Sequence, residues 1–128
     1  MSQFGQIKDS GKRQEFDTGA VRDTQDDKPR YDLIPPTALQ RVAMHYASGA
    51  KKYDPWNWER GMEHSRFYAS MFRHMQQFAL GDIDEDHLAA IVFNALSIMH
   101  FQDTGRTHLD DMMTRMPSNK EKHENQKN

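Results

Sequence analysis

An acidic turn in the second half of the chain carries the residues best suited to bind a metal ion. Residues 82–86 read Asp-Ile-Asp-Glu-Asp, and His87 follows them directly. Carboxylate oxygens are the preferred ligands of Mg2+ and suit Mn2+, and imidazole binds many divalent transition metals. We therefore expect Asp82, Asp84 and His87 to bind a divalent ion, Mg2+ or Mn2+. The structural alternative is that these carboxylates satisfy free N–H groups at the start of a helix.

Polar side chains also occur inside two apolar helical patterns close to this turn. His87 and Asn94 are seven residues apart, so they share one face of a helix. Asn94 lies in the most hydrophobic stretch of the chain, where an amide without a hydrogen bond costs about 2 kcal/mol or more. His74 borders the apolar stripe of the preceding helix, and Arg73 lies farther toward solvent. These residues either line a shared pocket or form a structural network that fixes helix packing.

The loop before these helices combines cationic and aromatic side chains. Residues 51–58 read KKYDPWNW, and Arg30 and Tyr31 repeat the same character earlier in the chain. Cationic side chains bind phosphates, and aromatic rings stack on nucleobases. The alternative is that the tryptophans fill the core of a small bundle. Because the sequence holds no Gly-rich phosphate loop, a phosphate would be bound by metal and cationic side chains.

Segments with apolar residues at helical spacing must position these side chains. The spacing predicts helices over about 37–48, 63–79 and 84–103, with Thr37 as the N-cap of the first. The third is apolar nearly all round, which is typical of a buried central helix. A short amphipathic piece over 108–116 is a candidate fourth helix, and no strand is predicted. The sequence therefore predicts an all-α fold of three or four helices.

Apolar residues are distributed unevenly along the 128 residues. Mean hydropathy is -0.97, and hydrophobic residues make up 36% of the chain. The two ends are nearly all polar, so we expect a flexible arm over 1–27, one helical domain over 28–116 and a disordered tail over 117–128. A core built from so few residues is marginal for a lone monomer, and we expect a homo-oligomer.

Composition also excludes several classes of protein. There is no cysteine, so disulfides and thiolate metal sites are excluded. No apolar run approaches the roughly 20 residues that a membrane span needs, and no signal peptide is recognisable. The net charge of -2 argues against general nucleic-acid binding. A cytoplasmic protein without a membrane partner is the expectation.

Several ordered motifs together resemble a phage and bacterial family, the one named for the dATP/dGTP diphosphohydrolase N-terminal domain. The resemblance covers about residues 19–100. The motifs are GAVRD (19–23), KPRYDLIPPTAL (28–39), GAKKYDPWNW (49–58), SRFYASMFRH (65–74) and GDIDEDHLAAIVFNAL (81–96).

This resemblance implies a MazG-like bundle, oligomeric and dependent on Mg2+ or Mn2+, in the cytoplasm of a phage host. The implied reaction is hydrolysis of a purine (deoxy)nucleoside triphosphate between the α- and β-phosphates, which yields a monophosphate and pyrophosphate. The catalytic residues are then expected to be His74, Asp84 and His87. The expected substrate-binding residues are Arg30, Lys51, Tyr53, Asn57, Trp58, Arg73 and Asn94.

The sequence departs from standard MazG-like enzymes in one respect. Those enzymes carry metal ligands in an E-E-x-x-E helix followed by an E-x-x-D helix, and the corresponding segments here read FRHMQQF and HLAAIVFN. Two alternatives follow. Either the site is built from His74, the 82–86 turn, His87 and Asn94, or the protein binds nucleotides without cleaving them, as a sponge for a signalling nucleotide does.

Overall fold

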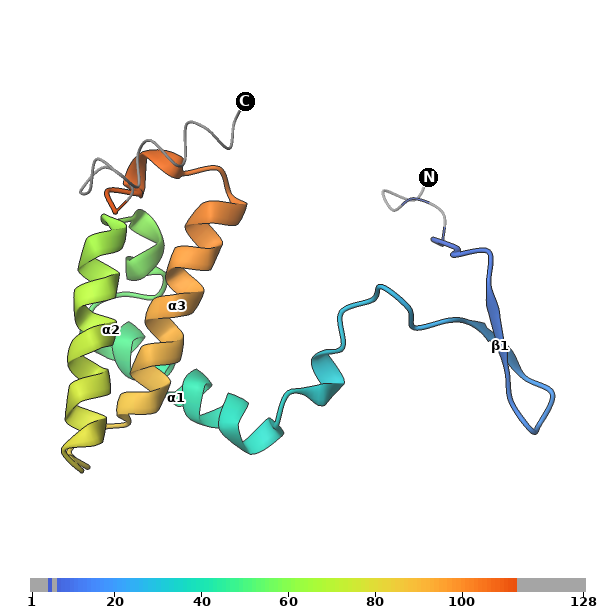
Figure 1. The fold of residues 1–128 in the computed structure, drawn as a ribbon, viewed down its shortest axis with the longest axis horizontal. Coiled ribbons are helices and arrows are strands. Elements are labelled where there is room, and N and C mark those ends of the chain that lie inside the picture. Colours follow the sequence, from blue (N-terminus) through green and yellow to red (C-terminus); the bar gives the residue numbers. More distant parts are fainter. Residues whose placement is uncertain (1–4, 6, 113–128) are drawn as a thin grey trace. The chain divides into compact units, whose positions relative to one another are not determined.

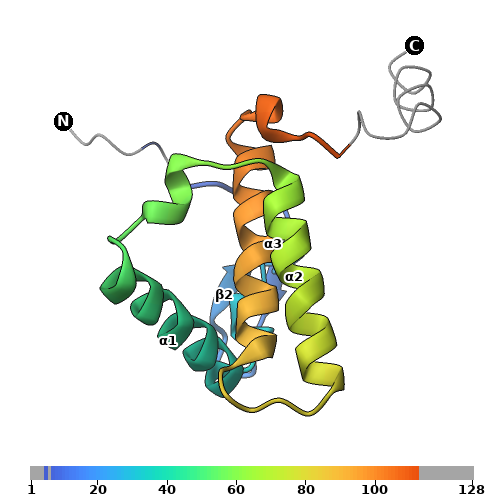
Figure 2. The ribbon, with the colours of Figure 1, turned by 90° about the vertical axis from the view of Figure 1, so that its left-hand side faces the viewer.

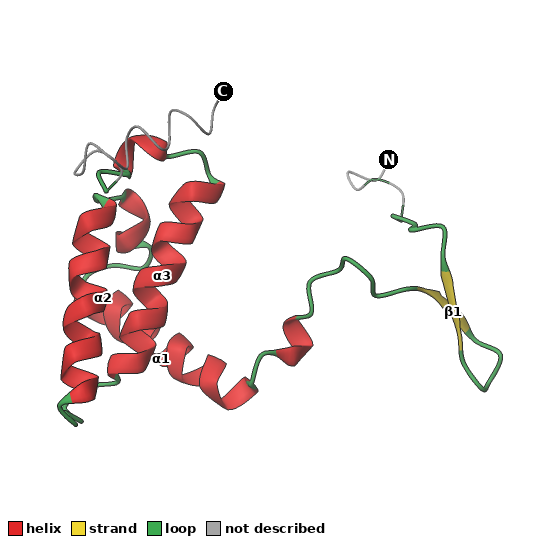
Figure 3. Cartoon of the chain, in the orientation of Figure 1, coloured by secondary structure: helices red, strands yellow, loops and turns green. Residues whose placement is uncertain are grey.

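The computed structural model describes residue 5 and residues 7–112. The chain divides into two units, Met1–Ile34 and Pro35–Asn128. The first unit carries a small β-hairpin and the second carries the three long helices, which are red in Figure 3. The predicted disordered tail over 117–128 lies outside the described residues.

The helical unit is built from α1 (Pro36–Lys52), α2 (His64–Ala79) and α3 (His87–Asp103). Figures 1 and 2 show α2 and α3 side by side and antiparallel, joined by the short acidic turn. The α2–α3 contact is the most extensive in the unit, and α1 also packs against α3. The described part of the unit also holds two 3-10 turns, η2 (Asn57–Arg60) and η3 (Thr107–Leu109). The all-α prediction is confirmed for this unit.

The ends of the helices differ from the predicted ones for local reasons. Helix α1 begins at Pro36, before the predicted N-cap Thr37, because proline is well suited to the first turn of a helix. It also continues through Gly49, the predicted stop, to Lys52. A glycine inside a helix costs about 1 kcal/mol relative to alanine, which neighbouring turns can tolerate. The predicted fourth helix is wrong over 108–112, where the structure has only η3 and a bend; its remaining residues lie outside the described ones.

The prediction that the chain contains no strand is also wrong. Strands β1 (Arg13–Glu15) and β2 (Val21–Asp23) pair antiparallel, with Arg13 opposite Asp23. The hairpin turns at Gly19, whose φ of +87° suits glycine. Both strands are largely exposed, so no alternation of apolar residues marks them.

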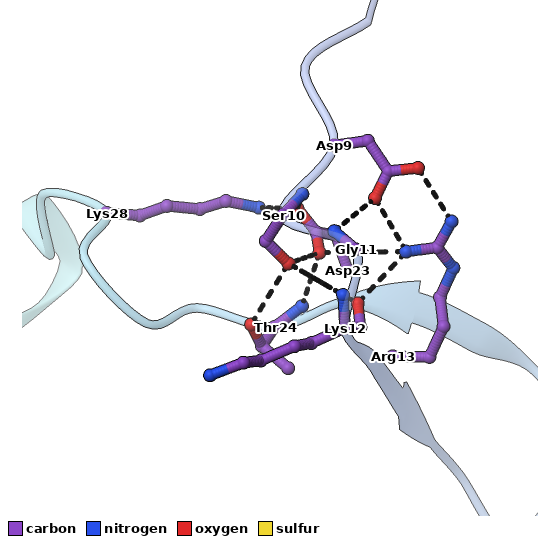
Figure 4. Close-up of polar contacts among 8 residues, drawn as sticks. All are labelled: Asp9, Ser10, Gly11, Lys12, Arg13, Asp23, Thr24 and Lys28. Atoms are coloured by element: carbon purple, nitrogen blue, oxygen red, sulfur yellow. Dashed lines mark hydrogen bonds and ion pairs between the residues drawn. The ribbon is translucent and has the colours of Figure 1, made fainter.

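Polar contacts hold this hairpin, as Figure 4 shows. Arg13 makes two hydrogen bonds to the Asp9 carboxylate, at 2.7 and 2.8 Å. Asp23 accepts hydrogen bonds from Ser10 and pairs with Lys28 at 3.3 Å. A flexible arm over 1–27 stays a prediction, but its residues 13–23 form a hairpin.

The core of the helical unit is small and lies between α2 and α3. Its buried hydrophobic residues are Phe67, Ala89, Ala90 and Phe101. The expectation that α3 is buried all round is wrong, since one of its faces is solvent-exposed. That apolar face consists of Leu88, Val92, Leu96 and Met99. Among residues 5 and 7–112, none of the helices has both the length and the hydropathy of a membrane-spanning segment.

Asp86 ties the start of α3 to α1. Its Oδ1 accepts a hydrogen bond from the backbone N–H of Ala89 at 3.1 Å, which caps the helix. Its two oxygens also accept hydrogen bonds from Arg41 on α1, both at 2.8 Å. The Arg41 guanidinium lowers the pKa of Asp86 to about 2. One carboxylate therefore performs two structural roles.

These two roles can be separated by substitution. Asp86→Ala removes both the cap and the ion pair, and we expect a loss of roughly 1–2 kcal/mol in the free energy of unfolding. Asp86→Asn keeps a good capping residue and removes only a partly exposed ion pair, so it should lose about 0.5 kcal/mol. Urea denaturation followed by circular dichroism measures both. Equal losses would show that the cap contributes little.

We propose that the apolar face of α3 is covered by a second copy of this chain, as the small core suggests. Val92→Glu should then shift the protein toward a monomer, because a charge would be buried in the contact. Gln40→Glu, at an exposed position on α1, is the control and should leave the assembly intact. Light scattering after size-exclusion chromatography gives the mass. A wild-type monomer at roughly 100 μM, a concentration at which oligomers with a micromolar Kd are assembled, would contradict the proposal.

Candidate functional site

A cleft of about 690 Å3 lies among α1, the loop that follows it, α2 and α3. Helix α1 contributes His45, Tyr46 and Lys52, and the loop contributes Tyr53 and both tryptophans. Such a volume suits a small-molecule ligand. All of its lining residues belong to the helical unit.

An aromatic cluster forms one part of the cleft wall. Trp58 packs edge-on against Phe93 and His100 of α3, with ring centroids 6.4 and 5.2 Å apart. Trp56 lies 5.7 Å from Trp58 and is 68% exposed. Trp58 therefore has the packing role that was the structural alternative, while also lining the cleft. Trp56 presents an open ring to a ligand.

A polar stripe on α2 forms another part of the wall. Arg66, Ser70, Arg73 and Gln77 follow one another at spacings of four, three and four residues, so they share one helix face, and all line the cleft. Asn94 of α3 donates hydrogen bonds to the Ala90 carbonyl at 2.8 Å and to Ser70 Oγ at 3.4 Å. The buried amide thus has the structural network expected of it and also reaches the cleft.

A pair of buried histidines lies where the turn between α2 and α3 meets the cleft. His74 Nδ1 and His87 Nδ1 are 2.9 Å apart, and His74 Nδ1 lies 3.9 Å from Glu85 Oε1. On its far side, His87 Nε2 donates to Asp84 Oδ1 at 2.9 Å. This hydrogen bond lowers the pKa of Asp84, so the carboxylate is ionised. Burial lowers the pKa of His74, which favours the neutral ring.

The metal-ligand prediction is only partly matched by this arrangement. The three residues whose ligand atoms lie within 4.8 Å of one another are His74, Glu85 and His87. Asp84 contacts His87 from behind, and Asp82 is exposed and outside the group. Glu85 therefore stands where Asp82 and Asp84 were expected, because the irregular turn directs its carboxylate toward the histidines.

Most of the expected substrate-binding residues come together in the cleft, with two exceptions. Those lining it are Tyr53, Asn57, Trp58, Arg73 and Asn94. Lys51 is exposed and does not line the cleft, whereas its neighbour Lys52 does. Arg30 belongs to the other unit and makes two hydrogen bonds to Asp32, at 2.9 and 2.8 Å.

Among the cleft residues that sequence reasoning missed are His45, Arg66 and Gln77. The spacing of Arg66, Ser70, Arg73 and Gln77 was a usable signal, since it marks one polar helix face. His45 gave no such signal. Burial lowers the pKa of His45, which favours the neutral ring, and this ring packs against Phe93 with centroids 5.1 Å apart.

Arg106 fixes the loop that carries the tryptophans. Its guanidinium donates to the backbone carbonyl of Arg60 at 2.7 Å and to Glu59 Oε1 at 3.0 Å. It also lies 4.7 Å from the centre of the Phe101 ring, a cation–π contact. Gly61 leaves room for this side chain, since a Cβ there would lie 2.3 Å from Arg106 Nη2.

The fold and the site define the class of protein, which is a small helical domain with cationic, aromatic and imidazole side chains in one cleft. Residues 18–112 match the family described as dATP/dGTP diphosphohydrolase, N-terminal, and the chain belongs to it. This confirms the resemblance found in the sequence motifs. Neither the curated proteins nor the solved structures compared with this chain give a match.

Gly61→Ala should destabilise the protein more than an ordinary glycine substitution. The alanine would have to adopt a φ of +101° and would displace Arg106, so we expect a loss of about 2 kcal/mol or more. Gly81→Ala is the matched control, because Gly81 has a φ of +83° with open space around it. It should lose about 1 kcal/mol. Equal losses in urea denaturation would mean that Arg106 moves away freely.

Proposed function

We propose that the protein hydrolyses a purine (deoxy)nucleoside triphosphate to the monophosphate and pyrophosphate, with Mg2+ or Mn2+ as the cofactor. The observation that carries this proposal is the composition of the cleft described above. Aromatic rings and cationic side chains line the same cavity, and His74 and Glu85 line it as well. The family to which the chain belongs is named for dATP/dGTP diphosphohydrolase, which supports the same substrate class.

The two ends of the cleft suit the two ends of a nucleotide. Trp58 packs at the level of His100 and Phe101, near the end of α3, whereas His74 meets His87 at its beginning. A base bound beside Trp56 and Trp58 would therefore direct its phosphates along α2 toward the histidines. Aromatic stacking favours any base, so the preference for purines rests on the family rather than on these rings.

Three cationic side chains are available to the phosphates. Lys52, Arg66 and Arg73 all line the cleft. Arginine can donate two parallel hydrogen bonds to phosphate oxygens, and lysine supplies a compact positive charge. Together they would hold the triphosphate and stabilise the negative charge that develops on the leaving pyrophosphate.

Hydrolysis also needs a group that accepts the proton of the attacking water. The neutral imidazole of His45 lines the cleft and lies outside the His74–Glu85–His87 group, so we assign this role to His45. The water oxygen forms a bond to the α-phosphorus while the bond to the β-phosphate oxygen breaks. His45 takes one proton, and pyrophosphate leaves with the bonding electron pair.

The histidine group has the nitrogen and oxygen donors that a divalent ion requires. His74 and Glu85 reach the cleft, His87 completes the set from behind, and Asp84 positions His87. A bound divalent ion would supply positive charge to the phosphates and would acidify the attacking water.

The test is incubation of the full chain with dGTP, dATP, dCTP, dTTP and GTP, each with Mg2+ or Mn2+, followed by phosphorus NMR. We expect a purine monophosphate and pyrophosphate, and no reaction after EDTA is added. Nucleotide binding without any product would contradict hydrolysis and favour the nucleotide sponge. No product and no binding would contradict both functions.

Two neighbouring lysines provide a matched pair for the cleft. Lys52→Ala should raise the KM about tenfold, because a charge-assisted contact to phosphate contributes roughly 1.5 kcal/mol. Lys51→Ala should leave the KM unchanged, since Lys51 does not line the cleft. Steady-state kinetics on both variants gives the comparison. Equal effects would place the triphosphate elsewhere.

A further inference from the structure

We propose that His74, Glu85 and His87 form a binding site for one first-row transition-metal ion of the Mn2+ type, in preference to Mg2+, and that Asp84 positions His87 for it. This proposal adds a metal site to the proposed function. It rests on that function only for the role of the ion in hydrolysis. The existence of the site follows from the arrangement of these four side chains.

The separations of the three ligand atoms suit one shared ion. The two Nδ1 atoms are 2.9 Å apart, and His74 Nδ1 lies 3.9 Å from Glu85 Oε1. All three ligand atoms lie within 4.8 Å of one another. Ligand atoms about 2.1 Å from a common ion are separated by no more than about 4.2 Å. Only a small movement of Glu85 is required, and this side chain is 53% exposed.

The hydrogen bond behind His87 prepares its ring as a ligand. An ionised carboxylate can only accept a hydrogen bond. His87 Nε2 therefore carries the proton and donates a hydrogen bond to Asp84 Oδ1. In the neutral ring, Nδ1 is then unprotonated, and its lone pair faces His74 and Glu85. A carboxylate that fixes the outer nitrogen of a ligand histidine is a common arrangement in metal sites.

The state of His74 follows from this hydrogen-bond pattern. Without an ion, a contact of 2.9 Å requires His74 Nδ1 to donate its proton to His87 Nδ1. With an ion, both Nδ1 atoms become ligands and the proton of His74 moves to Nε2. Both rings are buried, at 8% and 3% exposure, and come from different helices, so packing holds them in place.

The donor set decides the class of ion. Mg2+ is a hard ion that prefers oxygen ligands and retains several waters. Two imidazole nitrogens and one carboxylate suit divalent transition metals better, and their affinity is expected to rise from Mn2+ to Co2+. The group opens toward the cleft through His74 and Glu85, which leaves room for substrate oxygens at the ion.

Metal binding by the full, EDTA-stripped chain tests this proposal without any substrate. Co2+ serves as the probe, and its visible absorption reports nitrogen and oxygen ligands directly. Calorimetry with Mn2+ and Mg2+ gives the preference between these ions. We expect one Co2+ per chain, and Mn2+ binding at least about tenfold tighter than Mg2+ binding.

Three substitutions in one turn separate a ligand from its neighbours. Glu85→Gln should weaken Co2+ binding and change its spectrum, and Asp84→Asn should weaken it roughly 10- to 100-fold through His87. Asp82→Asn, an exposed carboxylate outside the group, is the matched control and should change neither. All three residues are exposed, so circular dichroism should show an intact fold.

The site would be overturned by an absence of Co2+ binding, by equal affinity for Mn2+ and Mg2+, or by equal effects of Glu85→Gln and Asp82→Asn. These outcomes are separate from the failure of the proposed function. A chain that binds Co2+ as expected but hydrolyses no nucleotide keeps the metal site and loses the enzyme. A chain that hydrolyses dGTP with Mg2+ and is unaffected by Glu85→Gln keeps the enzyme and loses the site.

Discussion

The structure of the helical unit depends on the burial of polar side chains in the seam between α2 and α3. His74, His87 and Asn94 are all less than a tenth exposed, and each requires a hydrogen-bonding partner there. His87 finds two, Asp84 and His74, while Asn94 finds Ala90 and Ser70. These contacts fix the rotation and the relative height of the two helices far more strictly than apolar packing would. They also place His74, with His87 beside it, at the edge of the cleft.

The remaining parts of the cleft are held by contacts made elsewhere in the unit. Arg41 and Asp86 join α1 to the start of α3, while Arg106, just after the end of α3, donates to the backbone carbonyls of Glu59 and Arg60. Each end of α3 is therefore tied to a different wall of the cleft. This division explains how a unit with so small a buried core keeps a cavity of about 690 Å3 between its elements.

The features predicted from the sequence are those that follow from helical periodicity, such as the three long helices. The features missed are those set by the local direction of the backbone in loops and turns. Periodicity indicated that His74 and His87 could share one seam, but helix rotation is not set by the sequence, so their 2.9 Å contact appears only in the structure. Lys51 came from the family resemblance. Helix α1 continues to Lys52, so the side chains of these two lysines point about 100° apart, and Lys52 is the one that lines the cleft. In the irregular turn, nothing in the residue types distinguishes Glu85 from Asp82. The hairpin escaped notice because polar contacts, rather than an apolar alternation, hold it.

Both tryptophans of the chain line the cleft. The tryptophan fluorescence of this protein therefore comes from the cleft alone. Trp58 lies against His100 and Phe93, so its emission reports the junction of the loop with α3. Trp56 holds a left-handed backbone conformation, with φ at +66°, which few aromatic residues adopt. Its exposed ring makes the emission sensitive to any base that stacks there, and the molecule carries its own optical probe of occupancy.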